Sequence, residues 1–328
     1  MKKKSVLITG GTGFVGKHIA LKFIDEGYEP ILYDVAATEM ELLEQTKGKW
    51  RFVTGGVEDW VKVLNTVREN GVEGIVHCAL PALPGSGETT KSNFDGCDNL
   101  LNACRLEKAK FVYVSSNAAY GHRPDDNPLL ETDRAPIFEG AQAALYEYGA
   151  MKHICESLTA MYHAVHGVDS VSVRFGWVYG PGTRRCWYPQ WFLANAVAGI
   201  PAKLDEGGDH KADYTYVKDA AQGVYLAFTV RPLKHRLFNI TSGKKVSALE
   251  VVETVRKVVP GADVKIGPGL MKKGLGNPAV HPVQAGPMLV TRAVEDLGYT
   301  TTSLEQGLRE TAAWFRTLAR IPVAPDPN

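Results

Sequence analysis

Short apolar runs alternate with amphipathic segments from the N-terminus of this chain to about residue 182. Each run has four to six residues, which is too short for a helix, and the segments between runs repeat their apolar residues at helical spacing. Strands that are covered on both faces of a parallel sheet have this appearance. The pattern therefore predicts an α/β fold with a doubly wound parallel sheet. The predicted strands cover residues 4–9, 30–34, 50–54, 74–79, 111–115 and 171–175.

The rhythm becomes irregular beyond residue 182, where short strands and helices alternate with loops rich in glycine, proline and lysine. We therefore expect two units, a large one over residues 1–182 and a smaller lobe over 183–328. Segments near 213–245 are expected to return to the sheet of the first unit. Asp59 and Ser303 are each placed to cap a helix, the second of which is the last helix of the chain.

A glycine-rich turn follows the first predicted strand. Gly10, Gly13 and Gly16 are spaced G-x-x-G-x-x-G and lead into an amphipathic segment that begins with Phe14 and Val15. A strand that feeds a helix through glycines brings backbone N–H groups and the positive end of the helix dipole to one point, where a pyrophosphate can bind. Because the glycines come directly after a buried strand, a Rossmann-type dinucleotide site is favoured over a turn without a ligand.

An acidic residue ends the second predicted strand. Asp34 lies 18 residues beyond Gly16, close to where a dinucleotide-binding fold places the carboxylate that accepts hydrogen bonds from the adenosine ribose. A carboxylate there repels a 2′-phosphate, and residues 35–38 offer no basic side chain to bind one. NAD is therefore favoured over NADP, although an aspartate at a strand end is also a common turn residue.

Composition and charge narrow the class of partner. The 37 basic and 36 acidic residues give no electrostatic case for binding nucleic acid or an anionic membrane. No stretch approaches the roughly 20 apolar residues that cross a bilayer. The five cysteines are scattered, without the spacing of a disulfide framework or a zinc site, so we expect a cytoplasmic protein without a metal. His77 and His153 are interpreted as packing residues, because no partner ligands lie at metal spacing.

Tyr148 and Lys152 lie four residues apart in a predicted helix, so their side chains share one face. An ammonium beside a phenol favours the phenolate and lowers the pKa of the phenol from about 10. Tyr148 is therefore a candidate general base for an alcohol proton. Ser116 follows the fifth predicted strand, at the edge of the sheet where such folds bind their ligands, and its hydroxyl can hold the substrate oxygen.

In order and spacing, these motifs resemble the extended branch of the short-chain dehydrogenase/reductase superfamily, the NAD-dependent epimerase/dehydratase family to which UDP-galactose 4-epimerase belongs. The resemblance runs nearly from end to end of the chain. Its later blocks are Tyr148-Gly149-Ala150-Met151-Lys152, then Arg174 with Val178-Tyr179-Gly180-Pro181, and Tyr214-Thr215-Tyr216-Val217-Lys218-Asp219.

The resemblance implies a bound NAD, a small-molecule substrate, and catalysis by Ser116, Tyr148 and Lys152. It also implies a homodimer formed through helices at roughly 90–106 and 145–165. The residues to which it assigns contacts with NAD are Gly10, Gly13, Phe14, Val15, Gly16, Asp34, Val57, Ala79, Tyr148 and Lys152.

Three positions depart from the pattern of family members that act on nucleotide sugars. Ala212 stands where an arginine often meets the diphosphate, and Trp177 stands where asparagine is common. Gly56 replaces an aspartate often found near the adenine, so contacts there are expected from backbone groups around Val57. The candidate substrate contacts are Ser116, Asn117, Trp177, Arg184 and Arg185, of which the two arginines are equally well interpreted as a solvated loop pair.

The sequence therefore predicts an NAD-dependent oxidoreductase that oxidises a secondary alcohol of a sugar-, polyol- or hydroxy-acid-like substrate, with Tyr148 as the general base. One alternative is a UDP-sugar 4-epimerase in which tightly bound NAD is reduced and reoxidised in place. Dehydration is least favoured, because Asn117 and Ala118 replace the Asp-Glu pair of nucleotide-sugar dehydratases. A non-catalytic NAD-sensing regulator is an alternative of another class, which the complete set of Ser116, Tyr148 and Lys152 disfavours.

Overall fold

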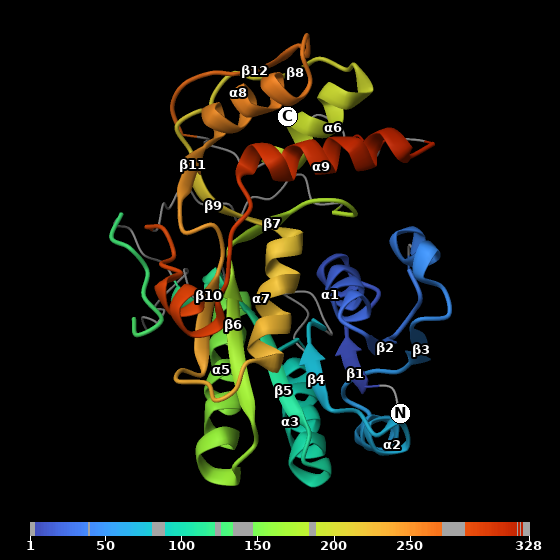
Figure 1. The fold of residues 1–328 in the computed structure, drawn as a ribbon. Coiled ribbons are helices and arrows are strands. Elements are labelled where there is room, and N and C mark those ends of the chain that lie inside the picture. The colour runs from blue at the N-terminus through green and yellow to red at the C-terminus, as the bar shows by residue number, and fades with distance from the viewer. Residues whose placement is uncertain are drawn as a thin grey trace.

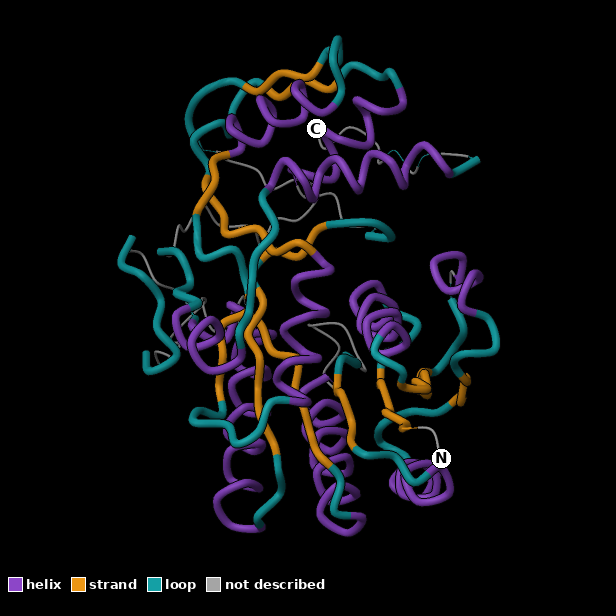
Figure 2. The backbone as a smooth tube through the Cα atoms, viewed as in Figure 1, coloured by secondary structure: helices purple, strands orange, loops and turns teal. Residues whose placement is uncertain are grey.

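The computed structural model describes residues 4–38, 40–80, 89–121, 126–133, 147–183, 188–270, 286–319, 321 and 323. They form two parts, one around a large sheet and one above it around two small sheets (Figure 1). Helices cover both faces of the large sheet, as the colouring of Figure 2 makes visible.

Seven parallel strands form the large sheet, in the order β10-β6-β5-β4-β1-β2-β3. This confirms the predicted doubly wound α/β fold, with the order reversing at β1. The seventh strand, β10, comes from the irregular second half of the chain and extends the sheet beyond β6. The strands are β1 (Lys4–Thr9), β2 (Tyr28–Asp34), β3 (Arg51–Thr54), β4 (Gly74–His77), β5 (Lys110–Ser116), β6 (Ser170–Phe175) and β10 (Leu237–Ile240).

Each face of the large sheet packs against its own helices, because successive side chains of a strand point to opposite sides. Val6 and Ile8 lie in one core with α1 and α7, whereas Leu7 and Ile75 lie in the other with α2, α3 and α5. Asp59 caps α2 by accepting from Lys62 N at 3.0 Å, as predicted. None of the described helices is both long and apolar enough to span a bilayer. The helices are α1 (Phe14–Asp25), α2 (Trp60–Asn70), α3 (Thr89–Glu107), α5 (Glu147–His166) and α7 (Val217–Thr229).

The upper part has its own core, in which Phe192, Val251 and Phe315 are fully buried. Ser303 caps the last helix by accepting from Gln306 N at 3.2 Å, which confirms the predicted cap. The elements of the upper part are β7 (Trp177–Tyr179), α6 (Tyr188–Ala198), β8 (Ala202–Leu204), β9 (Lys211–Tyr216), β11 (Lys245–Ser247), α8 (Ala248–Val258), β12 (Val264–Ile266) and α9 (Leu304–Thr317). The described residues also form three short helical turns: η1 (Met40–Thr46), η2 (Asn117–Tyr120) and η3 (Ala293–Leu297).

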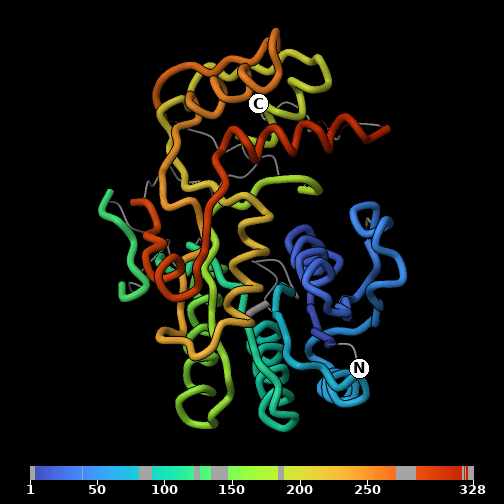
Figure 3. The backbone as a smooth tube through the Cα atoms, in the orientation of Figure 1, coloured from blue at the N-terminus to red at the C-terminus, as the bar shows by residue number. Residues whose placement is uncertain are grey.

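The chain crosses between the two parts several times (Figure 3). After β6 it forms β7, α6, β8 and β9 above, then returns for α7 and β10. It leaves again for β11, α8 and β12, and η3 then packs against β10 and α7 before α9 rises into the upper part.

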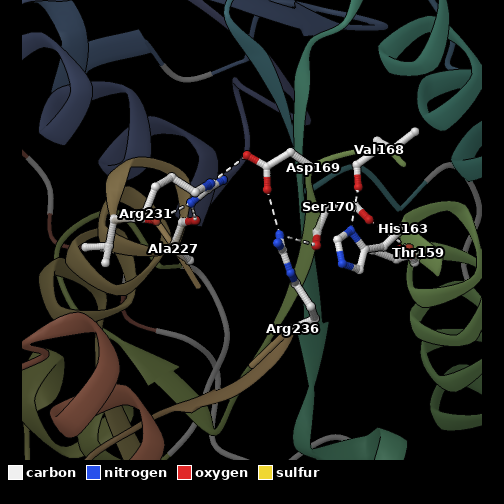
Figure 4. Close-up of polar contacts among 9 residues, drawn as sticks. Thr159, His163, Val168, Asp169, Ser170, Ala227, Arg231 and Arg236 are labelled. Atoms are coloured by element: carbon white, nitrogen blue, oxygen red, sulfur yellow. Dashed lines mark hydrogen bonds and ion pairs between the residues drawn. The ribbon is translucent and has the colours of Figure 1, made fainter. Parts of the chain in front are cut away.

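A carboxylate at the start of β6 holds the connection between α7 and β10 (Figure 4). Asp169 Oδ2 accepts from Arg231 Nε, and Oδ1 accepts from Arg236 Nη1, each at 2.6 Å. Arg231 Nη1 also donates to Ala227 O at 3.0 Å, at the end of α7. Partial burial by itself would raise the pKa of Asp169, but the hydrogen bonds from the two arginines lower it below its usual value. The ionised carboxylate therefore stabilises the edge of the sheet.

We expect Asp169→Asn to lower the free energy of unfolding by about 2 kcal/mol at pH 7, since hydrogen bonds to charged groups contribute about 1.5–3 kcal/mol. The pKa of Asp169 is depressed in the folded state, so this contribution is present above about pH 4 and is lost as the pH falls through the folded-state pKa. Urea denaturation of both proteins at pH 7 and pH 3 measures it. An equal difference at the two pH values would show that the charge of Asp169 is not what stabilises the fold.

Candidate active site

In the glycine turn between β1 and α1, neither Gly10 nor Gly16 has room for a side chain. Gly10 has φ +66°, and a Cβ on it would lie 2.8 Å from Ala79 N. A Cβ on Gly16 would overlap the carbonyl oxygen of Gly10, so α1 can approach the turn only because this residue is glycine. Gly13 is the N-cap of α1, and no side-chain hydrogen bond caps the helix.

The first turn of α1 is therefore open to an anion. The first helical hydrogen bond runs from Lys17 N to Gly13 O at 3.0 Å, so the N–H groups of Phe14, Val15 and Gly16 have no helical partner. Such groups, together with the helix dipole, bind phosphate oxygens. This turn and the close approach at Gly10 fit the pyrophosphate of a dinucleotide.

Asp34 lies beside the same turn. Its Oδ2 accepts from the hydroxyl of Thr12 at 2.7 Å and from Thr12 N at 3.2 Å, while Oδ1 accepts from Val35 N at 2.9 Å. Asp34 is half-buried at the end of β2. The glycine turn and this carboxylate are thus brought together, as a dinucleotide with its ribose hydroxyls requires. The contact through Thr12 was not anticipated from the sequence, although a hydroxyl within the turn is a visible signal.

Two further residues predicted to contact the cofactor, Ala79 and Val57, lie in different parts of the structure. Ala79 follows β4, touches Gly10, and donates from its N–H to Thr9 Oγ1 at 3.4 Å. Val57 follows β3, but its side chain is 4% exposed in the core and its carbonyl accepts from Asn99 Nδ2 at 3.1 Å. The structure therefore places Ala79 at the turn and Val57 in the layer between the sheet and α3.

Lys152 is fixed behind Tyr148 on α5. Its Nζ donates to Val114 O of β5 at 2.8 Å and lies 5.7 Å from the ring centroid of Tyr148. It also lies 4.9 Å from the ring centroid of Tyr113, and its side chain is buried. Tyr148 and Lys152 therefore share one face of α5, and the carbonyl of Val114 holds the ammonium against β5.

Ser116 and Asn117 stand at the end of β5. Ser116 Oγ accepts from Ala118 N at 3.2 Å, which caps η2, and donates to Asn117 Oδ1 at 3.1 Å. The short η2 packs directly on α5, because a Cβ on Gly149 would overlap Ala118 O. The residue next to Tyr148 is thus in contact with the segment that carries Ser116. This role of Gly149 was not foreseen from the sequence.

His77, on β4, is a buried and neutral structural residue. Its Nδ1 shares a hydrogen bond of 2.7 Å with Thr9 Oγ1. Burial, with a smaller contribution from the Lys152 ammonium, lowers the pKa of His77 to about 3. The interpretation of His77 as a packing residue is confirmed. His153 differs, because its side chain is 44% exposed and its Nδ1 lies 3.7 Å from Glu156 Oε2.

Among the described residues, no group of three or more histidine, cysteine, aspartate or glutamate side chains is arranged to hold a metal ion. A further histidine, His18, joins α1 to the connection after β7. His18 Nε2 shares a hydrogen bond of 2.7 Å with Pro181 O. Burial lowers the pKa of His18 to about 4, so the ring is neutral at pH 7.

The substrate candidates lie partly outside the described residues, since Arg184 and Arg185 belong to the stretch that is not described. Trp177 is half-buried on β7, where it pairs with Tyr214 of β9. Ala212 is 6% exposed on β9. Its small side chain is packed in the core of the upper part.

The chain is similar to a known protein family and to several enzymes named as acting on UDP-sugars. The model of the NAD dependent epimerase/dehydratase family matches residues 6–241. A probable UDP-glucuronate 4-epimerase of Rhizobium meliloti is 25% identical, with 94% of this chain and 96% of that protein covered. UDP-glucuronic acid decarboxylase 1 of Arabidopsis thaliana is 27% identical, covering 96% of this chain and 70% of that protein. The fold matches UDP-glucose 4-epimerase of Thermotoga maritima with a TM-score of 0.79 at 24% identity, covering 95% of this chain and 98% of that one.

We expect Asp34→Asn to weaken NAD binding about tenfold, because a charge-assisted hydrogen bond to the ribose is lost, and 1.4 kcal/mol corresponds to a tenfold change. Binding of NADP should weaken less, since the repulsion of a 2′-phosphate is removed. Isothermal titration with both nucleotides measures the change. Asp59→Asn, at the cap of α2, is the matched control and should bind NAD as the wild type does. Equal affinities in the wild type and Asp34→Asn would remove Asp34 from the cofactor site.

Proposed function

Because this chain belongs to the NAD-dependent epimerase/dehydratase family, we propose that it is a UDP-sugar 4-epimerase, which oxidises and re-reduces one carbon of the sugar with NAD as cofactor. The names of its relatives support this substrate class, since those above include a UDP-glucose 4-epimerase and a probable UDP-glucuronate 4-epimerase. They favour the alternative predicted from the sequence over the main prediction, net oxidation of a free sugar, polyol or hydroxy acid.

The observation that carries the proposal is the position of the Lys152 ammonium. It is buried, fixed by Val114 O at 2.8 Å, and 5.7 Å from the ring centroid of Tyr148. A buried ammonium with one carbonyl partner can still stabilise a developing negative charge nearby. Tyr148 provides such a charge when its phenol loses a proton.

Each group of residues at the site has a separate role in the proposed reaction. The glycine turn and Asp34 hold the cofactor, whose contribution when bound is reversible hydride transfer. Tyr148 takes the proton of the sugar hydroxyl as general base and returns it as general acid, while Lys152 stabilises the phenolate. Ser116 redirects its hydroxyl proton from Asn117 Oδ1 to the substrate oxygen and favours the carbonyl form. Neutral His77 adds no second positive charge to the site.

One observation favours net dehydrogenation as the second candidate. Ala212 is buried where many UDP-sugar enzymes of this family carry an arginine for the diphosphate, and the neighbouring Lys211 is exposed. An alanine cannot bind a diphosphate through its side chain. A substrate without a diphosphate would lose nothing by this replacement.

Product analysis distinguishes the two candidates. The purified protein is incubated with UDP-glucose, UDP-glucuronate and their N-acetylated analogues, and separately with free sugars and hydroxy acids. Formation of a 4-epimer without net NADH supports the epimerase, whereas net NADH from a free substrate supports the dehydrogenase. Tight NAD binding without either product would support the non-catalytic regulator and contradict both.

We expect Tyr148→Phe to lower kcat about 10²–10⁴-fold, the range that a general acid or base contributes. NAD affinity should change little, because the ring remains. The matched control is Tyr162→Phe on the same helix, which removes a phenol that donates to Asp98 Oδ1 at 2.6 Å, away from Lys152. Turnover and NAD titration of both variants measure the effect. Near-normal turnover in Tyr148→Phe would remove this phenol from the mechanism.

The predicted homodimer is also part of this proposal. Several large apolar side chains remain exposed on α3 and α5, although isolated exposed apolar residues are common. They are Phe94 (42%), Leu106 (47%), Ile154 (41%), Met161 (38%) and Val165 (67%). Their gathering on two adjacent helices supports pairing of α3 and α5 with the same helices of a second copy.

We expect Ile154→Glu to convert the dimer to a monomer, because a carboxylate would be buried in an apolar contact. Size-exclusion chromatography with light scattering measures the mass. Leu249→Glu on α8 is the control, since Leu249 is 42% exposed but lies in the upper part. A wild-type protein that is monomeric at micromolar concentration would contradict this part of the proposal.

A further inference from the structure

A buried ion pair joins α5 to β6 behind the candidate catalytic residues. Arg174 Nε donates to Glu156 Oε1 at 2.8 Å and Nη2 donates to Oε2 at 2.6 Å, so the contact is bidentate. The two side chains are 3% and 7% exposed. Glu156 lies one helical turn beyond Lys152, and Arg174 is in register with Ser115, the residue before Ser116. The ion pair therefore fixes where α5 lies along β5 and β6.

The same guanidinium supports the segment that carries Ser116. Its central carbon lies 4.1 Å from the ring centroid of Tyr120, the last residue of η2. The hydroxyl of Tyr120 donates to Asn239 Oδ1 of β10 at 2.7 Å, so both ends of this side chain are held. Since η2 begins directly after Ser116 and contacts α5 at Gly149, one cation touches both carriers of the candidate catalytic residues.

Stability alone does not account for this arrangement. Burying two charges has a large desolvation cost, and apolar side chains of similar volume often give an equally stable core. Arg174 Nη1 is also buried without a hydrogen-bond partner, which adds a further desolvation cost. Burial by itself would raise the pKa of Glu156, but the hydrogen bonds from Arg174 keep it below its usual value, so the pair is charged at pH 7. The bidentate contact of the planar guanidinium with the carboxylate fixes the orientation of the two side chains, which apolar packing would not do.

We propose that Arg174 and Glu156 are positioning residues, which hold the Tyr148–Lys152 face of α5 at a fixed separation from Ser116. This rests on the proposed function, because it concerns the same reaction. Both side chains lie in the layer between the sheet and α5, so they act through the catalytic residues and not on a ligand. A misplacement of about 1 Å can cost about 100-fold in rate.

Three variants of the full chain, each saturated with NAD, test the proposal. Glu156→Gln keeps the shape and removes the charge. Arg174→Lys keeps the positive charge but cannot make the bidentate contact. The double variant Glu156→Leu/Arg174→Met replaces the pair by apolar side chains. Asp169→Asn is the matched control, because it breaks another carboxylate–arginine contact at the opposite end of β6.

We expect kcat to fall about 10- to 100-fold in Glu156→Gln and to stay low in the double variant even where its melting temperature equals that of the wild type. In Arg174→Lys, which keeps the positive charge, kcat should fall less than in Glu156→Gln. KM and NAD affinity should remain within about twofold of the wild type. Asp169→Asn should lose stability but retain kcat. A double variant with both wild-type stability and wild-type kcat overturns the proposal, because the pair would then serve packing alone.

Hydrogen exchange provides a readout that needs no substrate. Amides at 147–152 should exchange faster in Glu156→Gln than in the wild type, and at the wild-type rate in Asp169→Asn. Unchanged exchange in Glu156→Gln also overturns the proposal. If the wild type epimerises no UDP-sugar, the proposed function fails, and the exchange rates still decide whether the ion pair positions α5.

Discussion

Parallel pairing of the strands is the constraint on which the candidate site depends. It brings the carboxyl ends of β1, β2, β4 and β5 to one edge of the sheet, so residues far apart in the sequence meet there. Gly10, Asp34, Ala79 and Ser116 are each the last residue of a strand or follow one closely. The helix that carries Tyr148 is in turn held by a carbonyl of β5, through Lys152. Without the common direction of the strands, these groups would lie at opposite ends of the molecule.

Local patterns in the sequence were sufficient to predict most of the large sheet. Apolar runs identified six of its strands, because strands covered on both faces are mostly apolar, even though β6 also buries Ser170, Ser172 and Arg174. The seventh, β10, could not be placed by its residues, since its position beside β6 depends on a pairing across more than sixty residues of chain. Its return to the sheet was anticipated only in outline. The caps at Asp59 and Ser303 were predictable because a cap is a local interaction.

In the candidate site, too, local motifs were predictable from the sequence and long-range contacts were not. The glycine spacing, the acid after β2 and the Tyr-x-x-x-Lys pair are short-range features, and each is visible in the sequence. The partners that fix them are not, because contacts such as Lys152 with Val114 or Arg174 with Glu156 arise only once helix and sheet are packed. A glutamate on a helix is ordinarily expected to face solvent, so Glu156 gave no signal of its burial. His153 shows the opposite error, since it was expected to pack and is nearly half exposed.

The repeated crossing of the chain between the two parts has a consequence for synthesis on the ribosome. When β6 emerges, the edge that β10 will cover and the face that α7 will cover are still open. Val171 and Val173 of β6 are fully buried in the finished protein, but α7 and β10, which cover them, are synthesised more than forty residues later. The nascent chain therefore exposes an apolar strand edge during elongation, where premature association competes with completion of the fold.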